Sequence, residues 1–166
     1  IPLSDTAVNS VDAAIAEVTG AISSDINEIG AVIGVFSGDP LSGGGIDVMK
    51  RGRTTGLTYG VVDMVNVSVS VKYGEECVSK KGFNATFENQ IYVVGADFSA
   101  GGDSGSVVLT TQPNGSGGVE AVGLLFAGND GGTLINPIDE VLTQLNVTLV
   151  TGTNTGVFTA DRGGGG

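Results

Sequence analysis

Short apolar runs separated by glycine-rich breaks constrain the fold of this chain more than any other feature. The 29 glycines among 166 residues fall between these runs and not at every third position, which excludes a collagen helix. The runs are rich in Val, Ile, Thr and Phe, and they cover residues 31–36, 60–71, 85–94, 106–110, 119–127 and 147–150. Such short and regularly broken runs are typical of an all-β sandwich or barrel.

The run over residues 61–71 alternates as a strand with one buried face does. One face carries four valines and the other carries polar side chains: Val65, Val67, Val69 and Val71 against Asn66, Ser68 and Ser70. We therefore expect the valine face to pack on the core and the polar face to meet solvent.

One short helix is predicted over residues 136–145. Asn136 can cap it, Pro137 suits its first turn, and apolar residues at 138, 141, 142 and 145 form one stripe. Residues 8–18 also have helical spacing, but their alanines fit a small-residue strand almost as well. Both interpretations stay open for that segment.

Charge and composition exclude several function classes. The chain has 18 acidic and seven basic residues, a net charge of −11, so we expect no nucleic-acid partner. Its apolar runs are far shorter than the roughly 20 residues of a transmembrane helix, so we expect none. There is no histidine, and the single cysteine, Cys77, is expected to be a small buried hydrophobe. We expect neither a metal nor a cofactor.

The two ends of the chain suggest processing. The first residues lack the basic and apolar regions of a signal peptide, so we expect that any such peptide has been removed. Residues 1–150 are expected to form the folded domain. Residues 151–166 are rich in Thr and Gly, and we expect a flexible tail or linker there.

The segment Ala-Gly-Gly-Asp-Ser-Gly-Ser-Val-Val over residues 100–108 carries the most specific chemical signal. Its small neighbours would let a carbonyl group approach Ser104, and a tight turn could aim the amides of Gly102 and Ser104 at one point as an oxyanion hole. An ordinary Asp-Ser-Gly turn between strands explains the same residues equally well. The local string leaves both interpretations open.

Three segments together resemble the chymotrypsin-like serine peptidases. Gly-Asp-Ser-Gly at 102–105 resembles their nucleophile motif, and Gly-Leu-Leu-Phe-Ala-Gly at 123–128 resembles their substrate-binding strand. The string Lys-Arg-Gly-Arg-Thr-Thr-Gly-Leu-Thr-Tyr-Gly at 50–60 resembles one branch of that family. The resemblance covers residues 11–145 and implies a Greek-key β-barrel, mainly the C-terminal one, followed by a short helix. Residues 1–36 would be a remnant of the first barrel and the inter-barrel linker.

The resemblance also implies residue roles. Ser104 would be the nucleophile, and the Gly102 amide would belong to the oxyanion hole. Substrate would contact four further positions: Phe98 near the base of an apolar specificity pocket, and Phe126, Ala127 and Gly128 along a strand edge. Asp12 matches the orienting aspartate, although a solvated surface carboxylate is an equal alternative. Asp103 is expected to stabilise the turn.

The absence of histidine leaves two functional hypotheses open. In this family the histidine precedes the aspartate in the sequence. The resemblance therefore implies a serine endopeptidase whose histidine lies outside this chain. Its expected partner is a polypeptide substrate or a companion chain that carries the first barrel and the histidine. Without imidazole the chain alone should be nearly inert. The alternative is an inactive peptidase-like module with a structural, binding or assembly role, assembling through exposed strand edges.

Two further patterns bear on location and partners. Asn-x-Ser/Thr sequons at Asn66, Asn84, Asn114 and Asn146 favour a secreted protein, and the acidity fits a salt-rich setting as well as ordinary solubility. Two interpretations exist for the basic residues Lys50, Arg51 and Arg53. They could contact an acidic partner or the Asp12 carboxylate, or they could lie on the polar faces of hairpin strands. We expect the polar strand faces.

Overall fold

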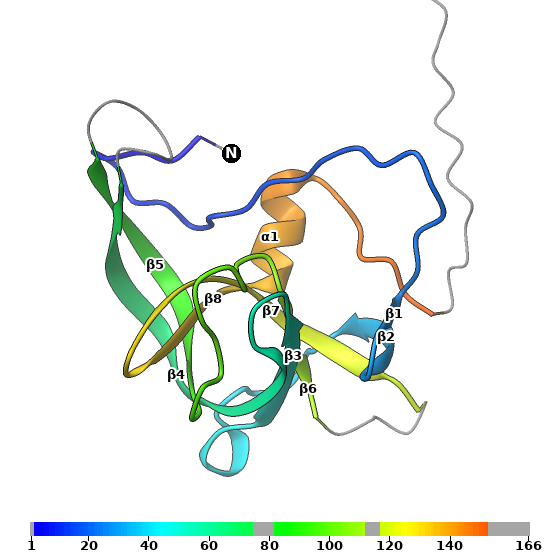
Figure 1. Cartoon of the computed structure of the whole chain (residues 1–166). Helices are drawn as coiled ribbons and strands as arrows, with labels where there is room; N and C mark the ends of the chain where they lie inside the picture. Colours follow the sequence, from blue (N-terminus) through cyan, green and yellow to red (C-terminus); the bar gives the residue numbers. More distant parts are fainter. Residues whose placement is uncertain (1, 75–81, 112–116, 153–166) are drawn as a thin grey trace, which may run out of the picture.

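Eight strands, one 3-10 turn and one α-helix make up the part of the chain that the computed structural model describes, which is residues 2–74, 82–111 and 117–152. The elements in chain order are β1 (Asp25–Ile26), β2 (Gly30–Val35), η1 (Ser42–Gly44), β3 (Asp47–Gly52), β4 (Gly56–Tyr73), β5 (Phe83–Val94), β6 (Val107–Thr110), β7 (Val119–Asn129), β8 (Gly132–Pro137) and α1 (Ile138–Leu145). The predicted all-β class with a short C-terminal helix is confirmed (Figure 1).

Six of the strands close into a barrel. They are hydrogen-bonded in the order β7-β6-β3-β4-β5-β8, and β8 pairs again with β7. Strand β6 follows β5 in sequence yet lies beside β3, which is the Greek-key arrangement. Outside the closed barrel, β2 pairs in parallel with the first part of β7, and β1 pairs with β2. The predicted Greek-key barrel is therefore confirmed.

Apolar side chains from all six barrel strands fill its interior. The main buried cluster consists of Val48, Val62, Ile91, Val93, Phe98, Val108, Val122, Leu125 and Ile135. Burying a Val, Leu, Ile or Phe side chain contributes about 1.5–3 kcal/mol, so this cluster is the principal source of stability. The predicted alternation in β4 is also confirmed, because Val65, Val67, Val69 and Val71 are half-buried while the polar residues between them are exposed.

The predicted helix forms, but its start differs from the expectation. Helix α1 begins at Ile138 with Pro137 as its N-cap residue and without a side-chain cap. Asn136 is not the cap. Its side chain is fully buried, donates from Nδ2 to the carbonyl of Leu124 (3.3 Å) and accepts from the amide of Asp12 (2.7 Å). The buried Asn136 amide thus satisfies its hydrogen-bonding groups by joining the Asp12 segment to β7.

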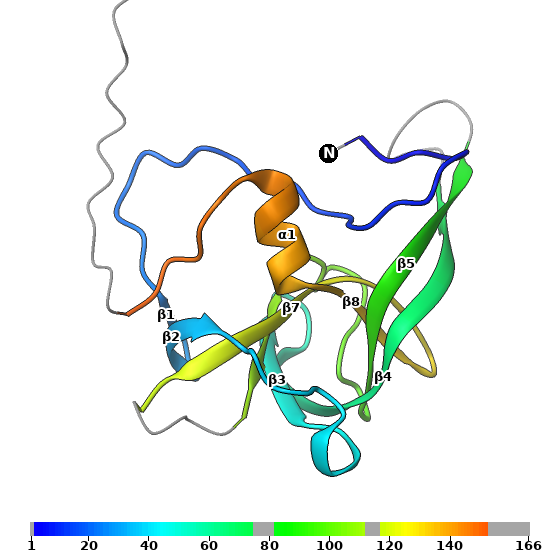
Figure 2. The ribbon, with the colours of Figure 1, turned by 180° about the vertical axis from the view of Figure 1, so that it is seen from behind.

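The N-terminal segment is neither a helix nor a regular strand. Residues 2–22 run across the distal half of the β4–β5 hairpin and past α1 before they reach β1 (Figures 1 and 2). One isolated bridge joins Asn9 to Phe87, and Val11 and Ala13 pack against Val141 of α1. Neither the helix nor the strand expected for residues 8–18 forms. Isolated contacts with the β4–β5 hairpin and with α1 hold this segment in place of a regular hydrogen-bond ladder.

The strand that we expected over residues 147–150 does not form. This segment is extended but pairs with no strand in the described part of the chain. Leu149 packs against the cluster that contains Val32 and Leu109, and the amide of Gly152 donates to the carbonyl of Val32 (2.9 Å). Leu149 and the Gly152 amide thus attach residues 147–152 to β2 and its neighbouring cluster.

Candidate functional site

Ser104 lies on a loop between β5 and β6 that is attached to β7. Its side chain is exposed, and its Oγ donates to the carbonyl of Phe126 at 3.4 Å. The amide of Gly105 donates to the carbonyl of Leu125 at 2.7 Å, and the amide of Leu125 donates to the carbonyl of Ser106 at 3.0 Å. These contacts bring Ser104 and Phe126, two of the predicted site residues, together at the end of the barrel.

The amides of this loop divide into two sets. Those of Asp103, Gly105 and Ser106 donate to carbonyls of the protein. For the amides of Gly102 and Ser104, no acceptor exists among the described residues. Gly102 has φ +99°, a conformation that side chains disfavour. Two neighbouring unpaired amides beside a serine hydroxyl are the donor arrangement that an oxyanion hole requires.

Asp103, buried behind Ser104, anchors the loop. One carboxylate oxygen accepts from the amides of Thr54 (2.7 Å) and Thr55 (3.2 Å), and the other accepts from the Thr55 hydroxyl (2.7 Å) and the amide of Ala100 (3.0 Å). The second oxygen also forms an ion pair with Lys50 Nζ at 3.3 Å. Both side chains of this pair are fully buried. The expected turn-stabilising role of Asp103 thus has a physical basis.

The environment of Asp103 favours its charged form. Burial alone would raise the pKa of the carboxyl, but hydrogen bonds from the Thr55 hydroxyl and from the amides of Ala100, Thr54 and Thr55 outweigh it. The pKa of Asp103 therefore lies well below its usual range. At neutral pH the carboxylate is therefore ionised, and its hydrogen bonds join the serine loop to the residues that connect β3 and β4.

Lys50 is placed differently from the sequence-based expectation. It lies on β3, its side chain is fully buried, and its Nζ contacts Asp103, the Thr55 hydroxyl and the carbonyl of Gly56. It neither lies on a solvated strand face nor contacts Asp12. The string at 50–60 places Lys50 and Thr55 on one hairpin, but it gives no sign of the partner Asp103, which is 53 residues away.

Two glycines allow the hairpin and the serine loop to pack closely. A Cβ on Gly52 would lie 2.3 Å from Asp103 Oδ1, and a Cβ on Gly102 would lie 2.2 Å from Arg53 Nη2. The exposed Arg53 guanidinium therefore lies directly against the candidate oxyanion hole. The basic string and the serine motif, about 50 residues apart, form one structural unit.

A pocket of about 350 Å³ adjoins Ser104. It is lined by residues 99–101, Ser104, Leu125 and residues 127–130, so Ala127 and Gly128 reach it as predicted site residues. Phe98 does not line it. The Phe98 side chain is 2% exposed and packs in the barrel core, and its neighbour Ser99 faces the pocket instead. The lining includes Ser99, Asn129 and Asp130, which differs from the apolar pocket we expected.

Strand β7 has an unpaired edge next to Ser104. Its pairing with β6 ends at Leu124, whereas its pairing with β8 continues to Asn129. Residues 126–128 therefore have a partner strand on one side only. An extended peptide could add to this edge by main-chain hydrogen bonds, with Ser104 at its end.

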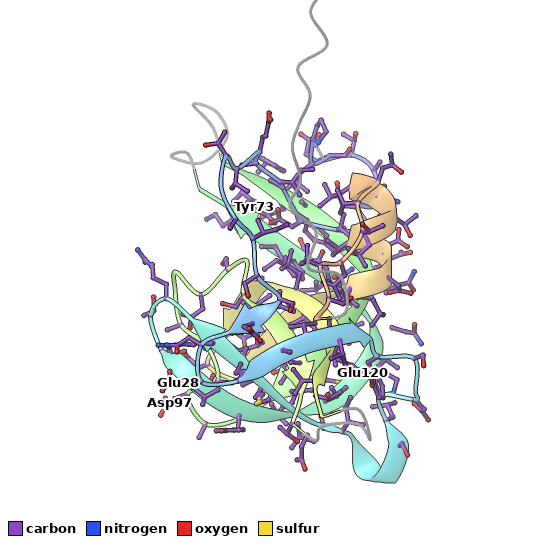
Figure 3. The ribbon with its side chains drawn as sticks, turned by 90° about the vertical axis from the view of Figure 1, so that its right-hand side faces the viewer. Glu28, Tyr73, Asp97 and Glu120 are labelled. Carbon is purple, nitrogen blue, oxygen red and sulfur yellow. The ribbon has the colours of Figure 1, made fainter. Side chains whose placement is uncertain are left out.

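Asp12 lies apart from this loop, among residues that hold the N-terminal segment in place. Tyr73 Oη donates to Asp12 Oδ2 at 2.5 Å, and the Asp12 amide donates to Asn136. Figure 3 shows Tyr73 on the distal hairpin beside the N-terminal segment, at the opposite end of the molecule from Glu28 and Asp97. Burial, the hydrogen bond and the charge of Asp12 raise the pKa of Tyr73 well above its ordinary value.

Within the described residues, Asp12 and Ser104 are linked only through intermediates. The Tyr73 ring lies 6.5 Å from that of Phe87, and the Phe87 ring lies 5.0 Å from that of Phe126. The Phe126 carbonyl then accepts from Ser104 Oγ. Sequence reasoning missed Tyr73, whose place at the end of a long strand gives no chemical signal.

Residues 2–74, 82–111 and 117–152 contain neither a cluster of metal-ligating side chains nor a membrane-spanning helix. No three Cys, Asp or Glu side chains converge there as metal ligands would. No helix in this part has the length and apolarity that a membrane span needs. Cys77 lies outside the described residues, so its expected burial stays a prediction.

Comparison with solved structures identifies the fold. No family model and no curated protein matches the sequence. Among solved structures, the chymotrypsin of Cellulomonas bogoriensis has a TM-score of 0.55 at 24% identity over 78% of this chain and 63% of its own. Protease A of Thermobifida fusca has a TM-score of 0.54 at 26% identity over 82% and 63%. A glutamic acid-specific serine protease has a TM-score of 0.50 at 24% identity over 81% and 62%.

These structures agree with the resemblance that the sequence motifs carry. The chain spans less than two thirds of the length of each matched protease. The strand-rich barrel and the single short C-terminal helix match the architecture of these neighbours. The chain thus has the β-barrel fold of the chymotrypsin-like serine proteases.

Proposed function

We propose that this chain is the serine-bearing and substrate-binding part of a serine endopeptidase. The observation that carries the proposal is the pair of unpaired amides, of Gly102 and Ser104, beside an exposed serine hydroxyl. The pocket at Ser104 and the unpaired edge of β7 support it, because they offer places for a substrate side chain and a substrate backbone.

In the proposed reaction, Ser104 Oγ attacks a peptide carbonyl and forms a carbon–oxygen bond. The two amides stabilise the charge that develops on the carbonyl oxygen, and the hydroxyl proton passes to a base. The base returns the proton to the leaving nitrogen as the peptide carbon–nitrogen bond breaks. Water then hydrolyses the acyl-serine by the reverse order of steps. Because the chain has no histidine, the base in this proposal is an imidazole from outside these 166 residues.

A second candidate function also has a specific observation behind it. The Asp12 carboxylate is occupied by Tyr73 at 2.5 Å, so it is engaged by a group other than an imidazole. An inactive module that binds a peptide or a companion chain along the β7 edge would need only the barrel and the pocket.

We also propose an extracellular location for this protein. The sequon residues Asn66, Asn84 and Asn146 support it, because all three are exposed.

Active-site labelling of the native protein, with whatever chains accompany it, tests the proposal. A fluorophosphonate should modify Ser104, identified by peptide mass spectrometry, and Ser104→Ala should abolish the labelling. Ser42→Ala is the matched control, because Ser42 is exposed on η1 and outside the site. Failure to label Ser104 in the native protein would overturn the peptidase proposal and favour the binding module.

The isolated chain offers a second test. Free imidazole should accelerate hydrolysis of an activated ester by the wild-type chain beyond its effect on Ser104→Ala, because it supplies the missing base. Circular dichroism of both proteins controls for folding. Equal rates for the two proteins at every imidazole concentration would contradict a nucleophilic role for Ser104.

A further inference from the structure

An unpaired cation lies beside the serine loop. Arg53 is exposed between β3 and β4, and it forms no ion pair or side-chain hydrogen bond with any residue in the described part of the chain. Lys50 and Arg51, its neighbours in the basic string, are both engaged in ion pairs. Arg53 Nη2 lies 2.2 Å from the position that a Cβ of Gly102 would occupy. The guanidinium is therefore a free donor group against the candidate oxyanion hole.

Three donors without an acceptor lie together at this point. The amides of Gly102 and Ser104 have no acceptor among the described residues, and the Arg53 guanidinium contacts the Gly102 backbone. Unpaired neighbouring amides bind anions, and the planar guanidinium fork matches the two oxygens of a carboxylate. A carboxylate also has enough lone pairs to accept from all three groups. Its charge and shape therefore fit this set of donors.

The unpaired edge of β7 leads to these donors. Residues 126–128 have no partner strand on the side of Ser104, whose Oγ donates to the Phe126 carbonyl. A peptide that pairs antiparallel to this edge ends with its C-terminus at Ser104, whereas a parallel peptide brings its N-terminus there. A cationic amino terminus would meet a guanidinium and two amide donors, but a carboxylate would accept from them. The donors therefore favour the antiparallel direction and a free C-terminus.

The nearby carboxylates do not cancel this attraction. Of the described residues that line the pocket, Asp130 alone is ionisable, and it comes four residues after Phe126 in the sequence. Four residues of extended strand span roughly 13 Å, which exceeds the screening length of about 8–10 Å at ordinary ionic strength. The charge of Asp103, behind the loop, is compensated by Lys50.

We propose that this end of the barrel binds the C-terminal carboxylate of an extended peptide. The peptide adds antiparallel to residues 126–128 of β7, and its carboxylate accepts hydrogen bonds from the Gly102 and Ser104 amides and from the Arg53 guanidinium. This inference rests on the strand edge and the amide pair of the proposed function, but on no catalytic step. Arg53 is the residue that distinguishes a free carboxylate from an uncharged chain end.

Two peptides that differ in one terminal group test the proposal. Acetyl-Val-Thr-Val-Ala with a free carboxylate, and the same peptide with a C-terminal amide, are titrated into the 166-residue chain. Binding is followed by ¹⁵N–¹H NMR at the amides of Gly102, Ser104 and residues 126–128, and at the Nε–H group of Arg53. The carboxylate peptide should bind roughly ten-fold more tightly than the amide, because charge-assisted hydrogen bonds are about twice as strong as neutral ones.

A third peptide tests the direction of binding. Val-Thr-Val-Ala amide with a free amino terminus carries a cation where the first two peptides carry an acetyl group. It should bind no more tightly than the acetylated amide, because its ammonium lies away from Ser104 in the antiparallel arrangement. Tighter binding of this peptide, or shifts at the donors without shifts at residues 126–128, would overturn the antiparallel arrangement.

Three variants make the carboxylate preference specific. Arg53→Gln should reduce the affinity ratio of the two acetylated peptides to about two- to three-fold, because only the amides remain, and Arg53→Lys should give an intermediate ratio. Lys72→Gln, at an exposed lysine on β4, should leave the ratio unchanged. Unshifted barrel resonances in each variant control for folding. Equal binding of both peptides to the wild type, binding of neither, or a wild-type ratio in Arg53→Gln would each overturn the inference.

The outcome is independent of the peptidase test. If fluorophosphonate labels Ser104 while the two acetylated peptides bind equally, the carboxylate inference fails and the peptidase proposal stands. If the carboxylate peptide is preferred through Arg53 while Ser104 is never labelled, the chain is a module that binds peptide C-termini. In that case the peptidase proposal fails and the role of Arg53 stands.

Discussion

Four hydrogen bonds and an ion pair hold the Asp103 carboxylate behind the serine loop, whereas a single hydrogen bond from Tyr73 holds the carboxylate of Asp12. The first carboxylate is fully buried, and the second is half-buried on a segment without regular structure. The loop is thus fixed by the barrel itself, while Asp12 depends on contacts between the N-terminal segment, the distal hairpin and α1.

The difference shows how the two halves of the candidate chemistry are built. The proposed electrophilic half, which is the candidate oxyanion hole and the pocket, is held in place by the fold of this chain. An internal cation, Lys50, supplies the positive charge that Asp103 needs, so the loop requires no other charged partner to hold it. The proton-accepting half of the candidate chemistry is represented in the described residues by the Asp12 carboxylate. This carboxylate accepts a hydrogen bond from the Tyr73 hydroxyl.

Lys50→Met should break the tighter of these two regions and have the largest effect on stability. It leaves the buried Asp103 carboxylate without its cation, which should lower the free energy of unfolding by about 3–5 kcal/mol. Urea denaturation followed by circular dichroism measures the change. Arg51→Met is the matched control, since the Arg51–Glu28 pair (3.0 Å) is partly exposed and should cost at most about 1 kcal/mol. Similar losses in both variants would contradict the special role of the buried pair.

Gly52→Ala tests the close packing of the same region. The new methyl group would lie 2.3 Å from Asp103 Oδ1, and the resulting shift should lower the free energy of unfolding by about 1–3 kcal/mol. Gly34→Ala in β2 is the control, because no other atom lies within 4 Å of its Cβ position. That variant should change stability by no more than about 0.5 kcal/mol. An equally stable Gly52→Ala protein would show that the hairpin and the loop are not tightly joined.

Acid should loosen the serine loop through Asp103. The pKa of this carboxyl is lower in the folded than in the unfolded protein, so its contribution is complete above the unfolded value of about 3.9 and is lost as the pH falls toward the folded value. In that window this group alone gives a slope of up to about 1.4 kcal/mol per pH unit. Thermal unfolding between about pH 5 and pH 2 should therefore be less pH-dependent in Asp103→Asn. A wild-type pH dependence in that variant would assign the acid sensitivity to other groups.

Much of the barrel could be predicted from the sequence, because its signals are local. The alternation of Val65 to Val71 and the apolar stripe at 138–145 each depend on a period that adjacent residues carry. The serine loop was also predictable, since its motif is contiguous. The position of Lys50 was not, because a lysine on a strand is ordinarily exposed and its partner is 53 residues away.

The site residues that sequence reasoning missed or misplaced share this non-local character. Tyr73 meets Asp12 across 61 residues, and Asn136 meets it across 124. Phe98 was expected at the base of the pocket, but one position decides whether a side chain faces the core or the pocket, and Ser99 is the residue that faces it. A shift of one residue reverses the face of an extended segment, and no local pattern fixes that register here.

Tyr73→Phe probes the weaker region and should have the smallest effect. Removing one hydroxyl from a half-buried hydrogen bond should lower the free energy of unfolding by about 1 kcal/mol, since Asp12 remains accessible to water. The raised pKa of Tyr73 gives a second readout: the phenol should stay neutral at about pH 10–11, so wild type and variant should develop the same tyrosinate absorbance there. A clearly smaller absorbance in Tyr73→Phe would mean that Tyr73 ionises normally and that Asp12 is not its partner. A loss as large as that of Lys50→Met would instead show that the Asp12 segment is as firmly built as the serine loop.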